Sequence, residues 1–178
     1  MHPSVARLIE LVAPASAPRA VDWERIETAL GTALPDDYKE IVEVYGGGVF
    51  DETLWILEPD CADPDYDLIA QTREQDQVLA ELWGAGEPKP AELQAGARVI
   101  PWANTEGSGH YLYWLIQPGQ KPAEWTVMLN EGRGPEWERH SQTCAEFLVG
   151  VMTGDTESVY FPDLPPEVHQ FDSNADIL

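Results

Sequence analysis

The chain has 178 residues, which suits a single domain with a substantial hydrophobic core. Hydrophobic residues make up 43% of it, which excludes a chain disordered throughout, and no apolar run reaches the roughly 18 residues of a membrane span. With 10 Lys and Arg against 32 Asp and Glu, the formal net charge of −22 opposes binding to nucleic acid or to an anionic membrane.

This charge favours a basic protein as partner, because an acidic surface attracts such a partner and accelerates its association. A second interpretation carries equal weight. The acidity can serve solubility, or it can reflect an acidic proteome in the source organism, since net charge says nothing direct about a site.

The N-terminal residues resemble a signal peptide only superficially. Arg7 and Glu10 interrupt the unbroken apolar segment that a signal peptide needs, so we expect a cytoplasmic protein. An amphipathic helix explains the segment better. Its apolar face would be Val5, Leu8, Ile9 and Val12. A Pro/Ala-rich linker over 14–20 follows.

Two further helices are predicted before the first strand. Asp22 can cap the first, WERIETAL, and Gly31 ends it. Pro35 suits the first turn of the second, which runs to the glycines at 46–48. Its buried face is predicted to be Tyr38, Ile41, Val42 and Tyr45, and its water-facing residues Asp37, Lys39, Glu40 and Glu43.

Residues 49–57 are predicted to be a strand region: Val49 and Phe50 are apolar, and LWILEP at 54–59 reads as a buried strand. The acidic loop PDCADPDYD follows, and then a long helix over about 66–83. The segment GAGEPKPAELQAGA, rich in Gly and Pro, is predicted to be a loop.

The second half of the chain changes to short segments rich in β-branched and aromatic residues. Strands are predicted over 98–106, 110–117, 124–131 and 137–141. Helical spacing returns in SQTCAEFLVGVMTG, where Thr143 and Glu146 have the spacing of a capping box. This order of elements predicts an α+β fold with a mainly antiparallel sheet.

Residues 155–178 form an acidic tail with six acids and no Lys or Arg. The aromatic residues Tyr160, Phe161 and Phe171 indicate that parts of this tail dock on the body of the protein. The two cysteines, Cys61 and Cys144, are too few for a disulfide framework, and Cys144 fits the apolar face of the last helix.

The sequence patterns that could indicate a metal site or a catalytic nucleophile are incomplete. Asp63, Asp65 and Asp67 alternate as in a calcium loop, but Leu68 occupies the position of the required Gly, and acids at a helix start explain them equally well. Ser108 and His110 lie in GSGHY, which lacks the flanking glycines of a nucleophile elbow and suits a hairpin turn. We predict no catalytic residue, cofactor or metal site.

Aromatic residues gather in the predicted sheet. Tyr111 and Tyr113 share one face of a strand, and Leu112 and Trp114 share the other, so both faces are apolar. A core on one face and a covering helix or tail on the other explain this pattern. The alternative is an aromatic groove with acidic rims, of the kind that serves protein recognition.

The segment LPDDYKEIVEVYGGG followed by LWILEP resembles the signature region of the SUKH superfamily, and CAEFLVGVM resembles the late helix of that group. The order of elements between about 22 and 153 agrees as well. The chain departs from the pattern where Ile41 or Val42 replaces a common aromatic residue, and in its acidic tail. The signature positions, expected to be structural, are Leu34, Pro35, Tyr38, Gly47, Gly48, Trp55, Phe147 and Leu148.

The resemblance implies a curved, mainly antiparallel sheet with helices packed against it. It places a single domain at 1–154, with its core at about 22–153 and the tail at 155–178. Bacterial members of the group are largely immunity proteins that bind and neutralise toxin effectors, often nucleases, and the family carries no catalytic residues. We therefore predict a non-enzymatic binding protein whose partner is a basic toxin domain.

Two alternatives stay open. The yeast cell-wall regulator for which the group is partly named implies a regulatory or scaffold module. An unrecognised hydrolase would use Ser108 or paired carboxylates.

The predicted contacts with a toxin are an acid-only run and the strand hairpin near residues 106–110. An acidic surface would steer onto the basic, nucleic-acid-binding face of a nuclease and block access of the substrate. The candidate residues are Asp51, Glu52, Glu58, Asp60, Asp63, Asp65, Asp67, Glu106 and His110.

Overall fold

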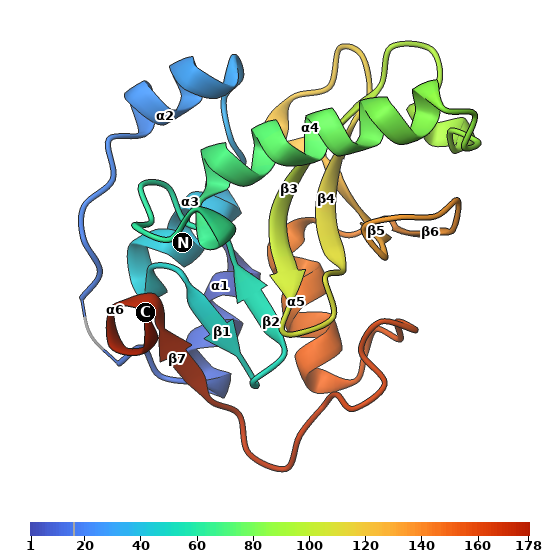
Figure 1. Ribbon diagram of the computed structural model, residues 1–178. Coiled ribbons are helices and arrows are strands. Elements are labelled where there is room, and N and C mark those ends of the chain that lie inside the picture. Colours follow the sequence, from blue (N-terminus) through green and yellow to red (C-terminus); the bar gives the residue numbers. More distant parts are fainter. Residues whose placement is uncertain (16) are drawn as a thin grey trace.

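The computed structural model describes residues 1–15 and 17–178. Ser16, in the linker predicted over 14–20, lies outside the described residues. Within these residues, seven antiparallel strands form an open sheet in the order β6-β5-β4-β3-β2-β1-β7 (Figure 1). The predicted α+β fold with a mainly antiparallel sheet is confirmed.

The strands are β1 (Gly48–Phe50), β2 (Leu54–Ile56), β3 (Arg98–Thr105), β4 (Tyr111–Ile116), β5 (Thr126–Asn130), β6 (Trp137–His140) and β7 (Phe171–Ser173). The helices are α1 (Pro3–Leu11), α2 (Trp23–Leu30), α3 (Asp36–Tyr45), α4 (Leu68–Gly84), α5 (Cys144–Thr153) and α6 (Asn174–Ile177). Short 3-10 helices are η1 (Pro64–Tyr66), η2 (Ala91–Leu93) and η3 (Pro122–Glu124).

The strand region predicted over 49–57 consists of two strands. β1 ends at Phe50, where Asp51 and Glu52 adopt left-handed backbone with φ of 51° and 55°. This turn folds β2 back against β1, so that Val49 lies opposite Trp55. The composition of this region does not reveal the turn. Its two central residues are acidic, as are those of the loop after β2, and acidic residues carry no specific signal for a left-handed backbone.

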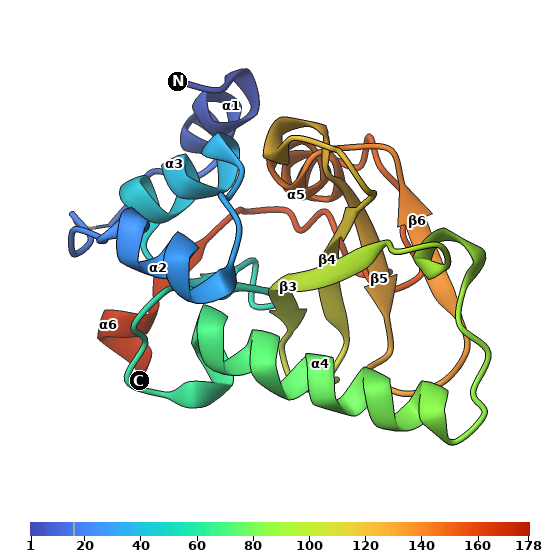
Figure 2. The same cartoon turned by 90° about the horizontal axis from the view of Figure 1, so that it is seen from above.

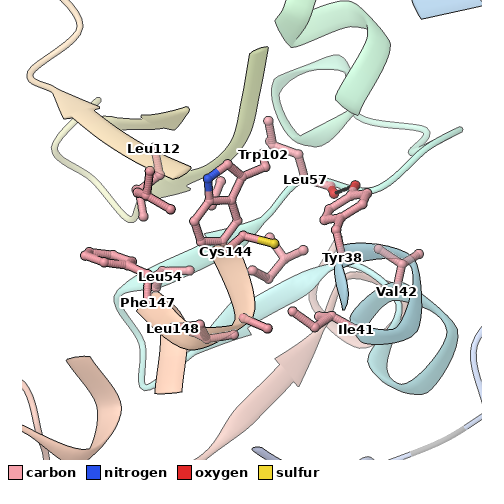
Figure 3. Close-up of a cluster of buried hydrophobic side chains, with 14 of the residues drawn as sticks. Tyr38, Ile41, Val42, Leu54, Leu57, Trp102, Leu112, Cys144, Phe147 and Leu148 are labelled. Atoms are coloured by element: carbon pink, nitrogen blue, oxygen red, sulfur yellow. Dashed lines mark hydrogen bonds between the residues drawn. The ribbon is translucent and has the colours of Figure 1, made fainter. Parts of the chain in front are cut away.

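Helices cover both faces of the sheet. Figure 2 shows α1, α3 and α5 on one face and α4 across the other. The larger core lies under α3 and α5, where Tyr38, Ile41, Phe147 and Leu148 point toward residues of the strands such as Trp102 (Figure 3). The Tyr38 hydroxyl donates a hydrogen bond to the backbone oxygen of Leu57 just after β2, so this buried polar group is satisfied.

A smaller core lies under α4. Leu79 packs there with Val99, Tyr113 and Met128. The Tyr113 hydroxyl donates to Oε1 of Gln75 at 3.1 Å. Helix cover therefore accounts for the second apolar face of β4, as the first of our two interpretations expected.

Asp37 is buried, although we expected it to face water. It is 5% exposed, and its Oδ2 accepts a hydrogen bond of 3.1 Å from the backbone N–H of Ala145. A carboxylate beside the N-terminus of α5 is favoured by the helix dipole. Asp37 precedes buried Ile41 by four residues, so the helical period already places the two on one face.

The C-terminal residues extend the sheet beyond β1. β7 pairs antiparallel with β1, with Phe171 opposite Phe50. The Phe171 ring also packs edge-on against Tyr45, with ring centroids 5.1 Å apart. Segments from opposite parts of the sequence thus lie side by side at this edge (Figure 1).

Close approach of the C-terminal segment explains two of the glycines after α3. A Cβ atom on Gly47 would lie 2.5 Å from Nδ2 of Asn174, and one on Gly48 would lie 2.3 Å from the backbone oxygen of Asp172. Gly46, with φ of 73°, ends α3 in a conformation that suits glycine. Conformational freedom and lack of a side chain are both needed in this turn.

Candidate partner-binding surface

The acidic loop after β2 is shaped by its own carboxylates. Asp63 accepts a hydrogen bond of 3.0 Å from the backbone N–H of Asp65 and caps η1. Asp67 caps α4, accepting from the backbone N–H of Ala70 at 2.8 Å and from that of Cys61 at 3.1 Å. Over residues 1–15 and 17–178, no group of three or more His, Cys, Asp or Glu side chains is arranged to hold a metal ion.

The remaining loop acid, Asp60, is exposed and forms an ion pair with Arg25 of α2. The Arg19 guanidinium donates to the backbone oxygen of Asp60 at 3.0 Å. Glu52 is also exposed, on the turn between β1 and β2.

Two predicted contact residues hold the C-terminal segment in place. Asp51 is buried, accepting from the backbone N–H of Gln170 at 2.9 Å, and Nδ1 of His169 lies 2.8 Å from its Oδ2. Glu58 is half-buried, accepting from the backbone N–H of Gly47 at 3.0 Å and from Nδ2 of Asn174 at 2.8 Å. Because Asp51 is buried while this segment is docked, its carboxylate does not face an incoming protein.

Asp65, Glu106 and Glu74 of α4 line the same surface hollow. The hollow has a volume of about 250 Å³ and lies between η1, the start of α4 and the β3–β4 hairpin. We call it the acidic hollow. The residues that matter here are Asp65, Tyr66, Gln71, Glu74, Glu106 and Tyr111.

The carboxylates of the acidic hollow affect both of its tyrosines. Burial raises the pKa of Tyr66, and Glu106, Asp63 and Asp65 add to the effect. Burial raises the pKa of Tyr111 from 10.0 to about 12, with contributions from Glu74 and Asp65. Both hydroxyls therefore stay protonated at neutral pH, so the tyrosines add no charge to the hollow.

The acidic hollow carries an excess of negative charge. Of the ion pairs in the described part of the chain, none involves Asp65, Glu74 or Glu106. Carboxylates that share a hollow without a cation favour a positively charged ligand or surface.

His110 lies on the same hairpin but packs against the C-terminal segment, with its ring 4.9 Å from that of Tyr160. Its Nδ1 is 3.4 Å from Oγ of Ser108, and that hydroxyl has a closer contact with the hydroxyl of Thr105. A nucleophile–base pair needs a third group that orients the base, and an aromatic ring at this position does not supply it.

The two cysteines are free thiols. Cys144 is 1% exposed, and burial together with Asp37 raises the pKa of its thiol well above the ordinary value. Burial raises the pKa of Cys61 to about 11. Both are protonated at neutral pH, which is unfavourable for a nucleophile.

Sequence reasoning missed three residues that matter here. Tyr66 lies where the acidic loop meets the helix predicted over about 66–83, and Glu74 lies inside that helix, so neither carries a signal of its own in the sequence. Asn174 cannot be singled out from the sequence, because an isolated Asn in a tail carries no periodic signal. Folding alone brings η1 and α4 beside the β3–β4 hairpin, and it brings the C-terminal segment beside Trp55 and Glu58.

The signature positions lie in the interior. Trp55 is 5% exposed, and its Nε1 donates to Oδ1 of Asn174 at 2.8 Å. Pro35 precedes α3 as its N-cap residue. The other apolar signature side chains are buried: Leu34 before α3, Tyr38 in α3, and Phe147 and Leu148 in α5.

Comparison with known proteins identifies the family. The model of the family SUKH_6, described as SMI1-KNR4 cell-wall, matches residues 21–148. No curated protein and no solved structure matches the chain. In the described part of the chain, no helix is both long and apolar enough to cross a membrane. Because the family match covers more than half of the sequence, the chain belongs to the SUKH superfamily.

Proposed function

We propose that this chain is a non-enzymatic protein-binding domain. In this proposal it acts in the cytoplasm as an immunity protein that binds a basic toxin effector and occludes its working surface. The observation that carries the proposal is the acidic hollow, which is lined by Asp65, Glu74 and Glu106. Among the described residues, none of these three carboxylates takes part in an ion pair. Membership of the SUKH superfamily supports it, because the bacterial members of that group are largely immunity proteins.

The mechanism is electrostatic steering followed by steric occlusion. A net charge of −22 accelerates the approach of a basic surface, and the exposed acids near the hollow orient it. On a nuclease, the most basic surface is the one that binds the phosphate backbone. A domain docked there excludes the substrate without altering any catalytic group of the toxin.

Four of the partner contacts predicted from the sequence are exposed, and we retain them in this proposal: Glu52, Asp60, Asp65 and Glu106. Three other predicted contacts accept hydrogen bonds within the protein and contribute through their negative field: Asp51, Glu58 and Asp67. The field of such a group reaches beyond its contacts, over about 10 Å at 0.1 M salt.

Capture of the partner from the source cells tests the proposal. We expect one basic protein to be retained in about 0.1 M salt and released in about 1 M salt, where the Debye length falls from about 10 Å to about 3 Å. The purified chain should abolish the activity of that protein at equimolar concentration. A partner that keeps its activity in the complex, or that binds equally at both salt concentrations, contradicts the proposal.

A regulatory module is the second candidate, because the matching family model carries the description SMI1-KNR4 cell-wall. It predicts several endogenous partners and no toxin among them. The same capture experiment distinguishes the two functions.

A further inference from the structure

The C-terminal segment completes a pocket beside Glu58. The pocket has a volume of about 450 Å³ and lies between linker residues 17–19, the glycine turn, the acidic loop and the last residues of the chain. It shares no lining residue with the acidic hollow. Its apolar walls are Ala17, Pro18, Ala62, Ala175 and Leu178.

Glu58 gives this pocket an anchored negative charge. Its Oε2 accepts from the backbone N–H of Gly47 and its Oε1 from Nδ2 of Asn174, and the thiol of Cys61 also interacts with this carboxylate. A carboxylate offers about four acceptor positions, so this one can accept another donor. Glu58 takes part in none of the ion pairs found among the described residues.

The other charged groups that line this pocket leave its net charge negative. Asp60 and Asp63 lie on the acidic loop that follows Glu58, and Arg19 faces them from the linker. The Arg19 guanidinium donates to the backbone oxygen of Asp60, whose carboxylate is paired with Arg25. Glu58 and Asp63 are therefore the negative groups available to a ligand.

We propose that this pocket receives a lysine or arginine side chain of the protein partner. The inference rests on the proposed function in taking a basic protein as that partner. Lysine and arginine combine an apolar stem with a charged head, which matches apolar walls that end at a carboxylate. An apolar side chain would leave the Glu58 charge unpaired in a drier site, and an acidic one would be repelled by it.

Part of the pocket wall lies outside the region that the family match covers. Ser173, Asn174 and Leu178 supply one wall and lie beyond residues 21–148, where the family match ends. Asn174 also orients Glu58 and accepts from the indole N–H of Trp55. A change in the tail can thus alter which side chain fits without altering the family core.

An NMR titration of the ¹⁵N-labelled full chain tests the pocket without a partner. The cationic probes are the N-methylamides of N-acetyl-arginine and N-acetyl-lysine, and the neutral probe is the citrulline analogue. We expect saturable shifts of the Gly47 amide, the Asn174 side-chain amide and the Trp55 indole N–H with at least one cationic probe. The citrulline analogue should bind about tenfold more weakly, since it lacks the charge that Glu58 pairs with.

Three variants complete the test. Glu58→Gln should weaken the cationic probe about tenfold, whereas Glu124→Gln, which removes the same charge from exposed η3, should not. Ala62→Trp keeps the charge but fills the pocket from an exposed position, so it should weaken binding while the protein stays folded.

Equal binding of charged and neutral probes, shifts confined to other residues, or full binding by Ala62→Trp would overturn the inference. Because no toxin is present in the titration, its failure leaves the partner-capture result intact. Conversely, saturation of the pocket by a cationic probe does not depend on the capture experiment.

Discussion

Replacing Gly47 by Ala should destabilise the protein through the C-terminal segment. Gly47 lacks the positive φ of its neighbour Gly46, so its backbone accepts an alanine without strain. The added Cβ would lie 2.5 Å from Nδ2 of Asn174 and 2.7 Å from Cγ and Cδ of Glu58, distances that require these side chains to move.

The cost of Gly47→Ala follows from what that movement breaks. Displacing Asn174 removes its hydrogen bonds to Glu58 and to the indole N–H of Trp55, which is 5% exposed. A buried donor left without a partner costs about 1–3 kcal/mol, and overpacking of a tight site costs about 1–3 kcal/mol. Since relaxation relieves part of both, we expect a loss of about 2–4 kcal/mol in the free energy of unfolding.

Urea unfolding followed by tryptophan fluorescence measures this loss. Gly84→Ala is the matched control, because a Cβ at Gly84 meets nothing within 4 Å and the residue lies in α4. That control should stabilise the protein by up to about 1 kcal/mol.

The double variant with Asn174→Ala supplies a second check. It should show a smaller cost of Gly47→Ala, since one of the two collision partners is gone. A Gly47→Ala protein within about 0.5 kcal/mol of the parent would refute the reasoning.

Three further outcomes are expected. The pKa of Tyr111 is about 12 in the folded protein and 10.0 for the free side chain, so its contribution to stability is present below about pH 10 and is lost as the pH rises to about 12. Urea unfolding across this pH range should show a smaller decrease in the free energy of unfolding for Tyr111→Phe than for the parent. Thiol labelling at about pH 8 should modify Cys61 slowly and leave Cys144 unmodified until the protein unfolds, since both thiols are mostly protonated there; prompt labelling of Cys144 would contradict its burial. Asp37→Ala should lower the free energy of unfolding by about 1–3 kcal/mol, because the N–H of Ala145 loses its acceptor; Asp36→Ala, on the exposed side of α3, is its control.

The fold could be predicted where local patterns decide the structure. The apolar period of α3 from Tyr38 to Tyr45, the capping box at Thr143 and the β-rich runs after residue 98 each specify an element by spacing alone. The turn at Asp51 and Glu52 was missed because the left-handed conformation of acidic residues has no compositional signal.

The surface could be predicted only in part. The acid-only run was visible, but the sequence does not reveal which carboxylates bind internal donors. Asp51 and Asp65 have the same chemistry, yet Asp51 is buried against the C-terminal segment and Asp65 faces solvent. Contacts between distant segments decide this difference, and a single sequence contains no periodic trace of them.

The most direct test of the account measures the affinity of the captured partner for a variant of the acidic hollow. Asp65→Asn, Glu74→Gln and Glu106→Gln together remove three charges from the hollow, and Glu24→Gln, Glu124→Gln and Glu157→Gln together remove three from exposed positions on other elements. We predict that the hollow variant binds at least about tenfold more weakly in 0.1 M salt and that its affinity depends less on salt, whereas the control binds nearly as the parent does. Equal affinity of the two variants at both salt concentrations would contradict recognition through the acidic hollow.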